Sequence, residues 1–190
     1  VGLGELLRHH DDAAGQRRIF GGAPYFHRLV VSLQQEGGFD RRQEGDELPE
    51  LRHAVTATTV VLGAMASRDW RPMHHDRDFA INRNGVRDIF INTPNNAAWF
   101  ERFVTDWTGP RGRLGRMKFR MSDSVFPGDD MVLSGRVAGT SIDDTGCGWV
   151  DLDLAVSVQG QLKTSCRARV ALPLDAADNP WERRNERWKP

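Results

Sequence analysis

One long helix-forming segment followed by four strand-forming runs constrains this fold more than any other feature of the sequence. The helix is predicted from about Pro94 to Trp107, with Thr93 as its N-cap. Gly109 and Pro110 are expected to end it. The strand-forming runs are separated by the turn signals PGDD, DDTG and QG, and they lie near Leu114 to Ser122, Met131 to Thr140, Trp149 to Val158 and Gln161 to Ala171. This order predicts an α+β protein in which a curved antiparallel sheet, expected as a meander, wraps around a long central helix.

Shorter elements precede the central helix. The segment from Leu51 to Val55 predicts a strand, and Thr56 is a good N-cap for the apolar run TTVVLGAMA that follows it. That second helix should stop near Ser67, because the next residues, RDWRPMHHDRD, combine a proline with dense charge. They predict an ordered polar loop, and Asp76 is expected to cap a short helix after it.

The composition excludes several classes of function. The chain has 190 residues, with 26 Lys and Arg against 26 Asp and Glu, so no net field favours nucleic acid or an acidic membrane surface. No apolar run reaches the roughly 18 residues of a membrane span, and the first residues do not resemble a secretory leader. We therefore expect a cytoplasmic protein that binds neither nucleic acid nor membrane.

No metal site is predicted. Cys147 and Cys166 have no partner at metal-ligand spacing and are expected to be buried thiols in a reducing compartment. The run HHDD at residues 9–12 is interpreted as an exposed face, since consecutive helical residues do not converge on one ion.

Asp69 and His74 are the candidate catalytic residues. They flank Pro72 in the loop DWRPMH, which can aim both side chains at one point. Adding water to an α,β-unsaturated thioester needs a base to activate water at C3 and an acid to protonate C2, and an Asp–His pair can share these tasks. The spacing alone is weak evidence, because most such pairs in loops are solvated or cap a helix.

The segment SRDWRPMHHDRDFA resembles the hydratase motif of the MaoC-like (R)-specific enoyl-CoA hydratases, with Asp69 and His74 at the motif's positions. The similarity is greatest to the subgroup of actinobacterial steroid side-chain degradation, through RDW, HHDRD, DIFIN, TDWTGP and the turn PGDD. The resemblance covers residues 46–174 and implies a hot-dog fold. It also implies an enoyl-CoA hydratase or 3-hydroxyacyl thioester dehydratase of lipid metabolism, with a bulky polycyclic acyl group as a plausible substrate.

The resemblance further implies a backbone N–H at the entrance of the central helix that binds the thioester oxygen. Asn92 stands where the family has glycine, so the donor is expected from Asn92 or Thr93, although both residues could simply cap the helix. A basic run could meet the phosphates of coenzyme A or of a carrier-protein arm, or could be a solvated strand face; it comprises Arg111, Arg113, Arg116 and Lys118.

The expected organisation is an N-terminal extension of unknown role (1–45), the hot-dog hydratase domain (46–174) and a C-terminal tail (175–190) that docks on the surface or on a partner. No cofactor is expected beyond the coenzyme A or carrier-protein thioester of the substrate. A single hot-dog layer leaves a sheet edge unpaired, so a homodimer or a heteromer with another hot-dog subunit is expected. Two alternatives remain: a non-catalytic hot-dog partner, or a different reaction such as thioester hydrolysis or cyclisation on the same scaffold.

Overall fold

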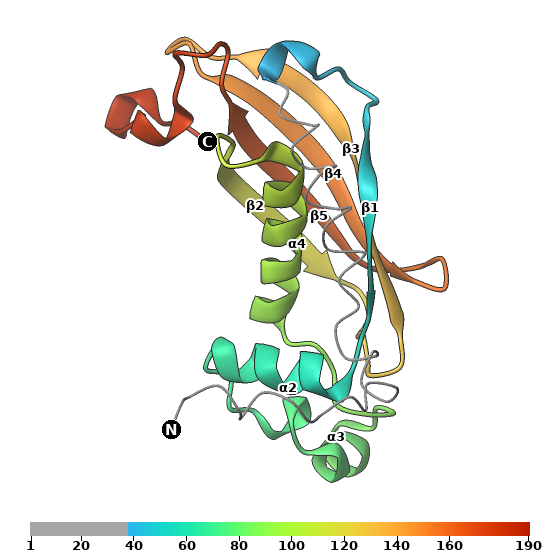
Figure 1. Cartoon of the computed structure of the whole chain (residues 1–190). Coiled ribbons are helices and arrows are strands. Elements are labelled where there is room, and N and C mark those ends of the chain that lie inside the picture. Colours follow the sequence, from blue (N-terminus) through green and yellow to red (C-terminus); the bar gives the residue numbers. More distant parts are fainter. Residues whose placement is uncertain (1–37) are drawn as a thin grey trace, which may run out of the picture. The chain divides into compact units, whose positions relative to one another are not determined.

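In the computed structural model, which describes residues 38–190, helix α4 (Thr93–Thr108) lies against the concave face of a curved five-stranded antiparallel sheet (Figure 1). The expected fold class is confirmed. The HHDD run and most of the expected N-terminal extension lie outside the described residues.

Local capping forms the helices near the positions that the sequence predicts. Helix α2 (Ala57–Ala66) begins in a reciprocal capping box between Thr56 and Thr59 and ends at Ser67. Helix α3 (Arg77–Asn84) is capped by Asp76, whose side chain accepts a hydrogen bond from the backbone N–H of Phe79. Both helices lie at the N-terminal end of α4 (Figure 1).

All four predicted strands after the helix are present, as β2 (Arg113–Met121), β3 (Asp130–Ile142), β4 (Gly148–Val158) and β5 (Gln161–Leu172). The strand order is β1-β3-β4-β5-β2, so the predicted meander is wrong for β2, which pairs with β5 at the far edge. Residues 122–129 cross from the edge strand β2 to β3, which lies beside the opposite edge strand, β1. This crossing segment forms backbone hydrogen bonds with two other parts of the chain. In the loop before α4, Ile91 N–H donates to Val125 O at 3.0 Å, and just after β1, Val55 N–H donates to Asp129 O at 2.8 Å.

Strand β1 (Glu47–Ala54) begins inside the charged stretch from Gly37 to Glu50, whose glycines and charged residues predict a linker or exposed loop. That prediction is wrong for the end of the stretch, because residues from Glu47 onward belong to the sheet. Leu48 and Leu51 are both buried, although they are three positions apart, because the register shifts between them where β1 pairs with β3. The irregularity breaks the alternation of apolar and polar residues by which a strand is recognised.

The core lies between α4 and the concave face of the sheet. Phe100, Phe103 and Val104 of α4 are buried there in one cluster with the inward residues of β4, among them Leu152 and Val156. Alternate residues of β4 face the other side, which is charged: Asp151 forms a bidentate ion pair with Arg169 of β5 at 2.7 Å.

The C-terminal segment, residues 173–190, docks on this outer face of the chain's own sheet. Trp188 packs on Trp149 of β4 with ring centroids 5.0 Å apart, beside the buried thiol of Cys147. The buried guanidinium of Arg183 pairs with Asp178 at 2.9 Å and donates to the carbonyl of Gly146 in the β3–β4 turn at 2.9 Å.

Candidate active site

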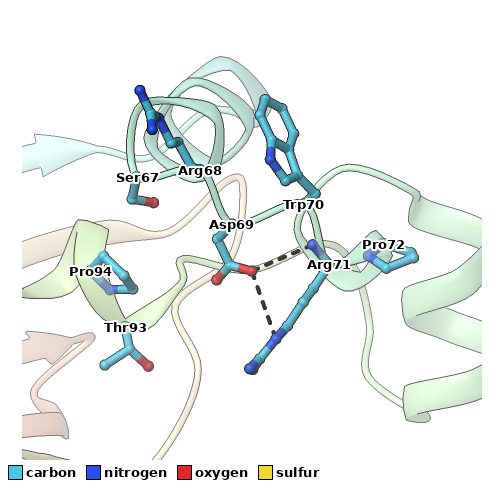
Figure 2. Close-up of a pocket in the computed structure, with 8 residues that line it drawn as sticks. All are labelled: Ser67, Arg68, Asp69, Trp70, Arg71, Pro72, Thr93 and Pro94. Atoms are coloured by element: carbon cyan, nitrogen blue, oxygen red, sulfur yellow. Dashed lines mark hydrogen bonds and ion pairs between the residues drawn. The ribbon is translucent and has the colours of Figure 1, made fainter.

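The C-terminal end of α2 positions Asp69. The Ser67 hydroxyl donates to Gly63 O at 2.8 Å, and the backbone N–H of Asp69 donates to Ala64 O at 2.9 Å. Between them Arg68 adopts a left-handed backbone with φ 55°, a conformation that is uncommon for residues with a side chain. This turn reverses the chain after α2 and brings the Asp69 side chain toward the N-terminal end of α4 (Figure 2).

A single turn of 3₁₀ helix over Pro72–His74 positions His74. Its imidazole is buried, and its Nδ1 lies 2.8 Å from the carbonyl oxygen of Phe90. A carbonyl can only accept, so Nδ1 must carry the proton, and in the neutral ring the lone pair is on Nε2. The Phe90 ring also packs edge-on against the imidazole at 4.9 Å and fixes its plane.

The structure brings the two predicted catalytic side chains together. His74 Nε2 lies 3.6 Å from Asp69 Oδ2, and the Asp69 side chain is 17 % exposed. Asp69 Oδ2 also accepts a hydrogen bond from Asn92 Nδ2 at 3.0 Å. Asp69 Oδ1 accepts a hydrogen bond from the backbone N–H of Arg71 at 3.4 Å. The side-chain Nε of Arg71 lies 3.8 Å from the same oxygen (Figure 2).

These contacts keep Asp69 ionised. The hydrogen bond from Asn92 is the largest cause, and it outweighs the opposing effect of burial; the Arg71 amide and the charges of His74 and Arg71 act in the same direction. Together they hold the pKa of the Asp69 carboxyl below its usual range. At neutral pH the site therefore presents a carboxylate, which accepts hydrogen bonds but has no proton to give.

An open pocket of about 710 Å³ adjoins Asp69. Residues 67–72 form one wall, and Thr93 and Pro94 at the start of α4 form the other (Figure 2). Trp70 is 64 % exposed at this wall. The pocket thus places the Asp69 carboxylate opposite the first turn of a helix.

At that helix entrance the predicted cap is one residue late. Asn92, not Thr93, is the N-cap, because its side chain accepts from the backbone N–H of Asn95 at 3.2 Å; Thr93 is the first helical residue. Within residues 38–190 the backbone N–H of Thr93 has no acceptor, and Thr93 lines the pocket, whereas Asn92 is buried. Of the two predicted oxyanion donors, the Thr93 amide is the accessible one.

The four predicted thioester-binding cations do not act as one group. Arg111 donates to backbone carbonyls of the C-terminal segment, among them that of Asp178 at 2.7 Å. Arg113 donates to the carbonyl of Arg183 at 3.0 Å and stacks on Trp188. Arg116 and Lys118 are exposed on the edge strand β2. A role in binding coenzyme A stays a prediction, and for Arg111 and Arg113 the structure supplies a different one, which is holding the C-terminal segment.

The side chain of Asn92 and the carbonyl of Phe90 belong to the site, although the sequence did not predict either role. Both residues lie in the segment DIFIN, and nothing in the composition of this segment indicates contact with Asp69 or His74. The strong N-cap preference of Asn immediately before Thr93-Pro94 could have indicated the true helix start.

In the described part of the chain, no group of three or more His, Cys, Asp and Glu side chains is arranged to hold a metal ion. None of the helices there has the length and apolar character that crossing a bilayer requires.

Known proteins share both sequence and fold with this chain. A 3-oxo-4,17-pregnadiene-20-carboxyl-CoA hydratase beta subunit from Mycobacterium tuberculosis is 36 % identical over 100 residues, which are 53 % of this chain and 75 % of that protein. The crystal structure of the ChsH1–ChsH2 complex from the same organism matches with a TM-score of 0.62 and 27 % identity, over 68 % of this chain and 98 % of the other. A MaoC-like dehydratase from Rhodospirillum rubrum matches with a TM-score of 0.63 and 18 % identity, over 72 % and 96 %. No model of a protein family matches the sequence.

Proposed function

Because this chain belongs to the MaoC-like family of hot-dog hydratases and dehydratases, we propose that it adds water to a trans-2-enoyl thioester or catalyses the reverse dehydration. One observation carries the proposal: Oδ2 of the ionised Asp69 carboxylate, a residue that lines an open pocket, lies 3.6 Å from Nε2 of the buried His74. Both atoms are hydrogen-bond acceptors when the imidazole is neutral, so they favour a molecule that donates to both. Water is such a molecule.

The proposed reaction uses this pair as a proton relay. Water donates one hydrogen bond to Asp69 Oδ2 and one to His74 Nε2, and its oxygen attacks C3 of the enoyl group. The proton that water loses goes to Nε2, while the C2–C3 π electrons move onto the thioester oxygen as an enolate. The same Nε2–H then protonates C2, so the pair returns to its starting state and the overall reaction is the addition of one water molecule.

Asp69 supports this relay as an anion. Its lowered pKa makes it a poor proton donor, which leaves delivery of the proton to His74. The carboxylate orients the water and stabilises the imidazolium that forms transiently, as an acceptor beside a developing positive charge does in other acid–base pairs.

The first turn of α4 supplies the complementary charge. The free N–H of Thr93, at the positive end of the helix, is the proposed donor to the thioester oxygen as the enolate forms. No redox cofactor enters the proposed reaction, since the addition of water neither oxidises nor reduces the substrate overall.

The acyl group is proposed to be bulky and polycyclic, carried by coenzyme A or by a carrier protein. The support is the name of the Mycobacterium tuberculosis relative, a hydratase of a pregnadiene carboxyl-CoA. The same name includes a beta subunit, and one similar structure is a complex, so we propose that this chain also works with a second hot-dog subunit, identical or different. A non-catalytic partner role is less well supported, because such a role does not require Asp69 and His74 to face each other.

The test is hydration of enoyl-CoAs of increasing acyl size, with isotopically labelled water traced to C3. Asp69→Asn and His74→Ala should each lower kcat/KM by about 100- to 10,000-fold. His75→Ala is the matched control for His74, because it removes an exposed imidazole from the same loop and should leave the rate near that of the wild type.

The assay is run on the chain alone and after co-expression with a hot-dog partner subunit. Wild-type rates in Asp69→Asn and His74→Ala would contradict the proposed site. Release of free coenzyme A without label at C3 would replace hydration by thioester hydrolysis. Activity that needs the partner but not Asp69 or His74 would assign this chain the non-catalytic role.

A further inference from the structure

We propose that Asn92 is a positioning residue whose carboxamide holds the Asp69 carboxylate beside His74 and ties it to the first turn of α4. The inference rests on the proposed function, because it takes Asp69 to be catalytic. Asn92 itself does not face the pocket: it is 1 % exposed and acts through Asp69.

All the hydrogen-bonding groups of the Asn92 carboxamide are engaged. One Nδ2–H donates to Asp69 Oδ2 at 3.0 Å and the other to Ser67 Oγ at 2.9 Å. The carboxamide oxygen accepts the backbone N–H of Asn95 at 3.2 Å and so caps α4. One side chain thus joins the end of α2, the catalytic carboxylate and the start of the central helix.

The surrounding groups determine which way the carboxamide points. The Ser67 hydroxyl donates its own proton to Gly63 O at 2.8 Å and therefore accepts from Asn92. A flipped carboxamide would turn its oxygen toward the Asp69 carboxylate and its NH₂ group toward the Asn95 N–H, so that acceptor met acceptor and donor met donor. The orientation with Nδ2 on Asp69 is the one that satisfies every group.

Two other groups with charge face Asp69 among residues 38–190, and both hold it more loosely. His74 Nε2 is 3.6 Å away and Arg71 Nε is 3.8 Å away, and the Arg71 side chain is 74 % exposed. The hydrogen bond from the buried Asn92 side chain, at 3.0 Å, is therefore the contact that fixes the rotamer of the carboxylate. It is also the largest cause of the lowered pKa of Asp69.

Two substitutions separate positioning from helix capping. Asn, Asp and Ser are about equally good N-caps, so Asn92→Ser and Asn92→Asp both preserve the start of α4. Asn92→Ser loses the donor to Asp69. Asn92→Asp keeps the shape of the side chain but turns a second carboxylate oxygen toward Asp69, which favours protonation of the pair.

The expected results differ between the variants. In Asn92→Ser, kcat falls about 100-fold while KM stays near that of the wild type, because Asp69 is misplaced without any loss of substrate contact. In Asn92→Asp, the acidic limb of the pH–rate profile also moves to higher pH. Asp76→Ser is the matched control, since it makes the same kind of cap substitution at α3, away from Asp69, and should change neither quantity.

A second measurement does not depend on activity. The side-chain carboxyl resonances of Asp are followed by carbon NMR as a function of pH, with Asp69→Asn identifying the Asp69 signal and circular dichroism verifying that each variant is folded. The titration midpoint of Asp69 should move upward in both Asn92 variants and stay unchanged in Asp76→Ser. An unchanged Asp69 midpoint in folded Asn92→Ser overturns the inference. A wild-type chain that hydrates no enoyl thioester, with or without a partner, but shows the shifted midpoint would overturn the proposed function and leave the coupling of Asn92 to Asp69 intact.

Discussion

Replacing Asp143 by asparagine tests the turn between β3 and β4, whose carbonyl groups accept hydrogen bonds from Arg183 of the C-terminal segment. Asp143 Oδ1 accepts three hydrogen bonds, from Thr145 N–H at 2.9 Å, Thr145 Oγ1 at 2.7 Å and Cys147 N–H at 3.0 Å. Its Oδ2 accepts the indole N–H of Trp149 at 2.8 Å. Burial opposes ionisation of this carboxyl, but the hydrogen bonds outweigh it and hold the pKa of Asp143 far below its usual range.

The size of the effect follows from these contacts. In Asp143→Asn the remaining oxygen can keep the three loop bonds, but the new NH₂ group then faces the indole N–H of Trp149, which is 1 % exposed and finds no other acceptor. A buried donor left unpaired costs about 1–3 kcal/mol of unfolding free energy. For a chain of this size that corresponds to a fall in Tm of about 2–4 °C per kcal/mol.

The pH dependence of this difference has a definite sign. A carboxyl with a folded-state pKa below its unfolded value stabilises the fold above the unfolded pKa, and that stability is lost as pH falls toward the folded pKa. With an unfolded pKa of about 3.9, the wild type loses at most about 1 kcal/mol from this group between pH 7 and pH 3. Asn does not titrate, so the difference in unfolding free energy between wild type and variant should be smaller at pH 3 than at pH 7 by that amount.

The assay is urea unfolding followed by tryptophan fluorescence at both pH values. Asp144→Asn is the control, because Asp144 is in the same turn with its side chain 80 % exposed. If Asp143→Asn unfolded like the control, or if its deficit grew in acid, the account of the turn would be wrong.

Two further predictions follow from burial. Gly63→Ala should lower the free energy of unfolding by about 1–3 kcal/mol, because its Cβ would lie 1.9 Å from Asn95 Nδ2 and would displace the Asn95 side chain, which donates to Thr59 O of α2 at 3.3 Å. Gly139→Ala has open space at its Cβ and should be neutral, and equal melting temperatures for the two variants would contradict the packing argument. Burial raises the pKa of Cys147 to about 11 and that of Cys166 to about 12. Both thiols should therefore resist a thiol-specific reagent at pH 8 until the protein unfolds. Rapid modification of the native protein would contradict their burial.

Resemblance and local pattern together predicted that Asp69 and His74 lie side by side, and they predicted most of the fold. Thr56 and Asp76 cap their helices through residues three positions away, and Pro94 and Gly109 mark the bounds of α4, so these signals depend on neighbours in the chain. No comparable local signal in the DWRPMH loop indicates that Asp69 and His74 point toward each other. Their spacing became informative through the family resemblance, and the structure then placed His74 Nε2 3.6 Å from Asp69 Oδ2.

Contacts between distant segments decided the rest. The sequence by itself determined one helix and the strands after it, because helix caps, turns and alternation of apolar residues are local properties. Only the tertiary structure placed β2 beside β5, turned Arg113 onto the C-terminal segment and brought Asn92 to Asp69, 23 positions earlier in the chain. The physical reason is that the hydrogen bond between Asn92 and Asp69 forms only after α2 and α4 have packed together. In a different packing of the helices, another asparagine could make an equivalent bond. The identity of a residue predicts what it can bond, whereas the fold decides which partner lies within reach.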